Sequence, residues 1–212
     1  RYDAYNWENN FSSENTRDLG FKLTSKWINA SLNFTNIDNY TFFDLESIQN
    51  GFKVIKPKQY NKSVQYLRLK AQKEFRLGKF ALDNSIMYQN VTSDDNVLNV
   101  PAIITRNTLY YTDEVFKKAL KFQAGIILNY FTEYNGNGYD SLLAEFYTQN
   151  QTKIGGFPRL DFFINAKVRQ TRIYLKAEHF NSSFTGYDYF SAPNNPYRDF
   201  TIRFGLVWNF FL

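Results

Sequence analysis

Charged side chains recur at alternate positions in segments whose remaining positions are apolar. A strand with this alternation has one polar and one apolar face, so its charges share a face. If the apolar face meets lipid, the charged face lines a lumen, where rings of charge set ion preference. The predicted lumen-lining residues are Lys22, Arg68, Lys70, Asp83, Arg106, Lys121, Glu133, Asp161, Lys167, Lys176, Glu178 and Arg203.

These residues comprise eight bases and four acids. The excess predicts a mildly positive lumen with a weak preference for anions. In the alternative interpretation, the charges pair across strands and only stabilise the fold. We favour this alternative, although the sequence does not exclude anion preference.

His179 stands near Ser182 and Ser183, and a serine beside a histidine is the pair that catalyses acyl transfer. One histidine without a distinctive serine motif is weak evidence, and a histidine at a strand end has polar loop residues around it in any case. We therefore predict that the protein is not an enzyme.

No metal or cofactor is expected. The chain has no cysteine and one histidine, which argues against thiolate and histidine-rich metal sites. Asp94 and Asp95 offer the hard oxygen ligands that calcium prefers, but a solvated turn in an asparagine-rich loop is the favoured interpretation.

The strand at the end of the chain carries the strongest signal of fold. Its even positions are large and apolar, and most of its odd positions are polar or small. The aromatic density suits a membrane–water boundary. Such a strand is typical of the end of an outer-membrane β-barrel. Its apolar positions are Phe200, Ile202, Phe204, Leu206, Trp208 and Phe210.

Composition agrees with a barrel rather than with a helical membrane protein. Mean hydropathy is −0.49 and aromatic residues make up 19% of the chain. No apolar run approaches the roughly 18 residues that a spanning helix needs. Only alternate residues of a barrel strand meet lipid, which explains the low mean hydropathy. The net charge of +5 is spread along the chain, so a nucleic-acid partner is not expected.

Short and long connections alternate, as in outer-membrane barrels. Residues 1–212 are predicted to form one antiparallel all-β transmembrane barrel of about ten strands, starting near Tyr2, with both ends on the side of the short turns. Short turns are expected near Ser25, Lys73, Thr112 and Arg169. The predicted long extracellular loops are 36–63, 91–102, 135–158 and 182–198, and the first and third are candidates to fold inward.

Aromatic residues in the last of these loops have two interpretations. Tyr187, Tyr189, Phe190 and Tyr197 offer rings for stacking on sugars or docking a partner. We favour the alternative, in which they pack the loop over the barrel mouth or extend the aromatic girdle.

From about Asn39 to its end, the chain resembles the "putative porin" family of Bacteroidota outer-membrane proteins. The resemblance rests on the order and spacing of many short stretches, none of them specific alone. They are Leu82-Asp-Asn84, Tyr88-Gln89, Leu109-Tyr-Tyr111, Phe116-Lys117, Gln123-Ala-Gly125, Phe146-Tyr-Thr-Gln149, Ile154-Gly-Gly-Phe-Pro158, Asp161-Phe-Phe163, Arg172-Ile-Tyr174, Glu178-His-Phe-Asn181, Tyr189-Phe190 and Gly205-Leu-Val-Trp-Asn-Phe-Phe211.

The resemblance implies a passive diffusion channel for small solutes or ions in the bacterial outer membrane, without a cofactor. Its expected partners are membrane lipid, the barrel-assembly machinery through the last strand, and other outer-membrane or surface proteins. Family members are longer, so the chain is expected to be the C-terminal part of a larger barrel. The final Leu212 also departs from the aromatic ending of such barrels.

Two other functions stay open at this point. A barrel of eight to ten strands has an interior filled by side chains, so a small barrel suits a non-conducting component that binds or assembles surface or secretion proteins. A soluble all-β carbohydrate-binding domain would instead pack its apolar faces against one another.

Overall fold

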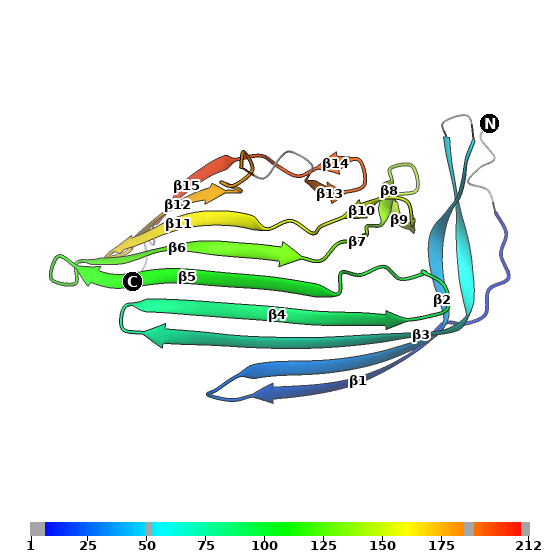
Figure 1. Ribbon diagram of the computed structural model, residues 1–212, viewed down its shortest axis with the longest axis horizontal. Coiled ribbons are helices and arrows are strands. Elements are labelled where there is room, and N and C mark those ends of the chain that lie inside the picture. The colour runs from blue at the N-terminus through cyan, green and yellow to red at the C-terminus, as the bar shows by residue number, and fades with distance from the viewer. Residues whose placement is uncertain (1–6, 50–51, 185–188, 209–212) are drawn as a thin grey trace.

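The computed structural model describes residues 7–49, 52–184 and 189–208, and these form strands, turns and loops without a helix (Figure 1). No helix in this part of the chain is long and apolar enough to cross a membrane. The long strands are β1 (Asn15–Thr24), β2 (Asn29–Gln49), β3 (Phe52–Leu77), β4 (Phe80–Thr92), β5 (Ile103–Val115), β6 (Leu120–Phe131), β11 (Arg159–Val168), β12 (Thr171–Glu178) and β15 (Thr201–Trp208).

These nine long strands of the described residues form one sheet in the order β1-β2-β3-β4-β5-β6-β11-β12-β15, and every neighbouring pair is antiparallel. Long strands that are neighbours in the chain are therefore neighbours in the sheet, as expected for strands joined by hairpins. Within the described residues β1 and β15 do not pair with each other, so the sheet is open at both edges.

One face of the sheet, here called the outer face, carries the apolar side chains in register from strand to strand. Phe34 pairs with Leu19 on one side and Leu67 on the other, and Leu175 pairs with Phe204. Phe204 remains 82% exposed, so none of the described residues covers it. A soluble sandwich would bury such residues, and an exposed apolar face of this size is typical of a surface that contacts a partner or lipid.

Two predicted turns are wrong by several residues. β3 continues past Lys73 to Leu77, and the turn comes at Gly78, which has a φ of 60°. β5 continues past Thr112 to Val115, and the turn spans 116–119. Lys73, on the outer face, and the acidic pair that follows Thr112 interrupt the apolar alternation, but both segments remain paired in the sheet.

The predicted loop 36–63 is also wrong, because these residues extend the β2–β3 hairpin well beyond the band of alternating residues. Asp38 pairs with Ser63, and Phe43 pairs with Pro57. The register shifts between Asp38 and Tyr40, where Asn39 has a φ of 60°. A bulge reverses which face the following residues point to, so the regular alternation is lost although the strands continue.

The remaining long connections contain short strands. Residues 132–158 hold β7 (Tyr134–Asn135), β8 (Gly138–Asp140), β9 (Glu145–Thr148) and β10 (Lys153–Ile154). Residues 179–200 hold β13 (Phe190–Ala192) and β14 (Asn195–Pro196), and 93–102 form a loop without strands.

All these connections lie at the same end of the sheet as the far part of the β2–β3 hairpin, residues 40–49 and 52–60, and this end is here called the loop end (Figure 1). β1 starts at the loop end, where Ser12 and Gln59 exchange hydrogen bonds. The first described residues therefore lie beside the loops, not on the short-turn side as predicted. The strand expected near Tyr2 and residues 209–212 fall outside the described residues.

Candidate functional site

The face opposite the outer face, the inner face, carries most of the predicted lining residues. They point the same way because they alternate with the apolar residues of the same strands. Lys22 and Lys70 flank Ser31 across three strands, and Arg106 pairs with Asn129. Within the described residues, no ion pair includes Lys22, Arg68, Lys70, Asp83, Arg106 or Lys167.

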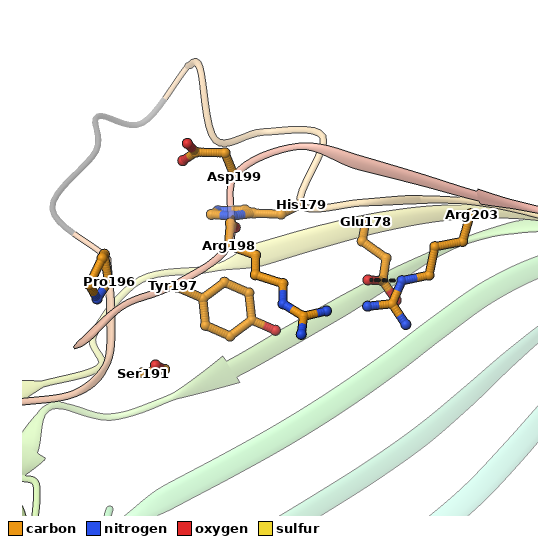
Figure 2. Close-up of a pocket in the computed structure, with 8 residues that line it drawn as sticks. All are labelled: Glu178, His179, Ser191, Pro196, Tyr197, Arg198, Asp199 and Arg203. Carbon is orange, nitrogen blue, oxygen red and sulfur yellow. Dashed lines mark hydrogen bonds and ion pairs between the residues drawn. The ribbon is translucent and has the colours of Figure 1, made fainter.

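Four other predicted lining residues form a connected charge cluster near the loop end, on β11, β12 and β15. Lys176 Nζ lies 3.3 Å from Asp161 Oδ2 and 2.9 Å from Glu178 Oε1. Arg203 Nε lies 3.0 Å from Glu178 Oε2, as Figure 2 shows. Acids and bases alternate along this chain of contacts, so the cluster neutralises itself and holds the three strands together.

Asp161 is the buried centre of the cluster, with 2% of its surface exposed. Its Oδ1 accepts the backbone N–H of His179 at 2.9 Å and lies 3.7 Å from Arg159 Nε. A buried carboxylate needs such partners because the protein interior solvates charge poorly. The sequence prediction missed Arg159, although Arg159 lies two residues before Asp161 and therefore on the same face.

Among the described residues, no hydrogen bond joins the His179 ring to the hydroxyl of Ser182 or Ser183. Its ring is fully buried, its Nδ1 lies 2.8 Å from the Arg198 carbonyl oxygen, and the rings of Tyr189 and Tyr197 meet it edge-on. The backbone N–H of Ser182 donates to the His179 carbonyl oxygen. These contacts make His179 an anchor of the 179–200 connection on the end of β12.

A cavity of about 340 Å³ adjoins the charge cluster at the start of β15 (Figure 2). It is lined by Glu178, His179, Ser191, Pro196, Tyr197, Arg198, Asp199 and Arg203. Tyr197 is held by Arg159, whose Nη1 donates to the Tyr197 hydroxyl and whose guanidinium lies over the Tyr197 ring. Glu178 and Arg203 of this lining pair with each other, whereas no ion pair among the described residues includes Arg198 or Asp199.

The loops fold over the inner face at the loop end. Val64 and Tyr60 of β3 point inward and are buried against Val97 of the 93–102 loop. β9 reaches across from the β6 side and pairs with β2 in parallel at Phe43 and Asp44. Of the two loops expected to fold inward, 135–158 supplies part of this cover and 36–63 forms the hairpin on which the cover rests.

Two predicted lining residues have other surroundings. Glu133 lies beyond the end of β6, and its carboxylate is 3.6 Å from Lys153 Nζ. It therefore belongs to the loops and not to the open part of the inner face, here called the wall. Lys121 is on the wall but is paired with Glu114 at 3.1 Å, near the short turn 116–119. The sequence prediction placed Glu133 on the wall because alternation continues for a few residues past the strand.

Contacts within the chain also show the surroundings of the loop aspartates and of the loop aromatic residues. Asp94 Oδ2 lies 2.6 Å from Lys62 Nζ, and this hydrogen bond raises the pKa of Lys62. The described residues contain no group of three or more histidine, cysteine or acidic side chains placed to share a metal ion. Tyr189 is buried against Phe157 and His179, which agrees with aromatic packing of the loop; Tyr187 lies outside the described residues.

The inner wall includes groups that sequence reasoning did not single out. Arg172 pairs across strands with Lys167, and Arg76 and Glu74 form an ion pair near the end of β3. The signal for all three was available, since they alternate with outer-face apolar residues. A shallow furrow of about 400 Å³ crosses the wall between Tyr110 and Tyr174 and includes Asp83 and Arg106.

A family model described as "Putative porin" matches residues 1–212, the whole chain. No curated protein and no solved structure shows a significant match.

Proposed function

Because the chain belongs to the putative porin family, we propose that it forms the wall of a β-barrel in a bacterial outer membrane and passes small solutes or ions by diffusion. The observation that carries this proposal is the two-faced sheet. Its outer face keeps large apolar side chains exposed along β1 to β15, and its inner face carries charges. This is the distribution of a barrel between lipid and water.

The unpaired charges of the inner wall support a preference for anions. Among the described residues, one acid of the predicted lining set has no ion pair, Asp83. The bases of that set without an ion pair are Lys22, Arg68, Lys70, Arg106 and Lys167. Charges that pair within the protein contribute little field to a passing ion, whereas free ones attract counter-ions.

Reversal potentials of the protein in planar bilayers under a salt gradient test this proposal. We expect open channels with a reversal potential of the sign for anions, and a shift toward cations when Arg68 and Lys70 are both replaced by glutamate. Lys153→Glu is the matched control, because Lys153 lies in the loops. Cation preference of the unmodified protein would reject the selectivity, and absence of conductance from inserted protein would reject the channel.

The packed loops favour one second candidate, a non-conducting barrel that binds or assembles other surface proteins. Val64 is completely buried on the inner face, so the loop end is covered at that point. Inserted protein that carries no current, with loops accessible to protease from outside, would support this candidate over the channel.

In either case, we propose that the outer face contacts membrane lipid and that the barrel-assembly machinery recognises the last strand. Neither proposal requires catalysis or a cofactor.

A further inference from the structure

The outer face is uniform on some strands and interrupted on others. On β6 every outward residue is apolar or aromatic, from Leu120 to Tyr130. β4 and β5 each place an asparagine at the centre of the same face: Asn84 lies between Leu82 and Ile86, and Asn107 lies between Thr105 and Leu109.

The two amides are direct cross-strand neighbours. Asn107 Nδ2 donates to Asn84 Oδ1 at 2.8 Å, and Thr105 Oγ1 donates to Asn107 Oδ1 at 2.8 Å. We name Asn84, Thr105 and Asn107 the amide patch. Its three members are half-buried, so part of each side chain is available to a neighbour.

The amide patch lies midway across the apolar band. Asn84 is four residues from Phe80 and four from Tyr88, the aromatic residues at either end of the band on β4. At about 3.3 Å per residue, Asn84 is some 13 Å along the strand from each end. Asn107 is likewise four residues from Tyr111. Neither short side chain can reach the headgroups from this depth.

Lys73, the remaining polar residue in this region, differs from the amides. It pairs with Asn84, but its long side chain extends to the β1–β2 turn, where Nζ donates to the Lys26 carbonyl at 3.2 Å and lies over the Trp27 ring. The ammonium group of Lys73 therefore lies at the end of the apolar band and not at its centre. The amides have no such route.

Hydrocarbon would leave part of the patch without hydrogen-bond partners. Asn84 Nδ2 donates to the carbonyl oxygens of Lys73 and Leu82. Asn107 Nδ2 has two hydrogens but one acceptor among the described residues. Polar groups facing lipid are costly, and in membrane proteins they concentrate where another protein surface covers them.

We propose that the amide patch is the centre of a two-fold contact with a second copy of this chain in the membrane. An amide is both donor and acceptor, so the patch complements itself, as a contact about a two-fold axis requires. On the neighbouring strand β3 the outward residue Ala71, which pairs with Ile86, is small; it allows close approach on that side of the patch, which favours association in lipid. The proposal rests on the membrane location proposed above.

Single cysteines test the contact cleanly, because the chain has no cysteine of its own. Leu109→Cys and Ile86→Cys place a thiol beside the patch and leave the amides intact; both positions are exposed. Leu175→Cys, on the outer face of β12, is the matched control. After mild oxidation in lipid vesicles, we expect a disulfide-linked dimer from at least one of the first two variants and none from the control.

Adding Asn84→Leu and Asn107→Leu to the cysteine variants completes the test. These changes suit a lipid-facing surface and should preserve insertion, but we expect the cross-linked fraction to fall at least tenfold. Equal cross-linking at Leu175→Cys, no dimer from either patch variant, or a dimer that survives loss of both amides would overturn the proposal. Failure of the protein to float with vesicles would reject the membrane location itself, which separates the two proposals.

Discussion

The inner face is two different surfaces on the same strands. On β3, Val64 near the loop end is completely buried, whereas Arg68, four residues further along and on the same face, is exposed and in no ion pair. The strand itself is continuous between them. The difference comes from the loops, which cover the first position and leave the second open. Stability should therefore depend on the loop end, and selectivity on the wall.

The largest expected effect is at the loop end. Val64→Asp places a carboxylate without a partner among Tyr60 and Val97. We expect the free energy of unfolding in lipid or detergent to fall by about 3–5 kcal/mol, because an unpaired buried charge is strongly unfavourable. Urea titration measures it. Arg68→Gln is the control and should leave the unfolding midpoint unchanged. Equal losses of unfolding free energy at both positions would contradict the difference between the loop end and the wall.

Asp161→Asn tests the charge cluster. The substitution keeps the shape of the side chain but removes the negative charge that lies near Lys176 and Arg159. We expect a loss of about 1–3 kcal/mol in the free energy of unfolding. Asp83→Asn, on the exposed wall, should change it by less than about 0.5 kcal/mol. A larger effect at Asp83 would show that wall charges also hold the fold.

Gly205→Ala tests whether side-chain packing on the wall contributes to the free energy of unfolding. A Cβ at Gly205 would lie 2.4 Å from the Tyr174 ring, so the ring must move away. Because Tyr174 is 43% exposed and can move, we expect a modest loss of about 1 kcal/mol in unfolding free energy. Gly20→Ala is the control, since its Cβ meets only the tip of the Asn33 side chain. No difference between the two would mean that the ring does not support the wall.

The smallest effect is expected at Asp38, outside the apolar band. The Ser63 hydroxyl, followed by the Asn36 amide and the Arg17 guanidinium, lowers the pKa of Asp38. A lowered pKa stabilises the fold above the carboxyl's unfolded value of about 3.9, and the contribution disappears as pH falls through the folded value. Unfolding midpoints of Asp38→Asn and the unmodified protein should therefore converge on acidification; a constant gap would contradict this.

Much of the fold was predictable because its signal is local. A period of two assigns each residue to a face wherever the strand is regular, and the predicted faces of β12 and β15 are confirmed by their register. The turn expected near Arg169 occurs at 169–170. The loop 36–63 was mispredicted because register shifts at Asn39 and between Leu45 and Ser47 interrupt the alternation while pairing continues.

The surroundings of the charges were not predictable in the same way. Lys22 and Asp161 have equivalent positions in the alternation, yet one is exposed and the other is almost fully buried. Their difference depends on residues far away in the chain, such as the loop that brings Arg198 onto His179. Glu133 was misplaced for a related reason, since the end of β6 is set by its neighbours in the sheet.

The amino-acid sequence alone therefore determined which side of each regular strand is apolar, because successive side chains of a strand point to opposite faces and the apolar residues recur at every second position. Only the tertiary structure decided which charges are neutralised, which have no ion pair, and which polar residues meet across strands at the centre of the outer face. Those properties arise from cross-strand register and loop packing, which join residues that no local pattern connects.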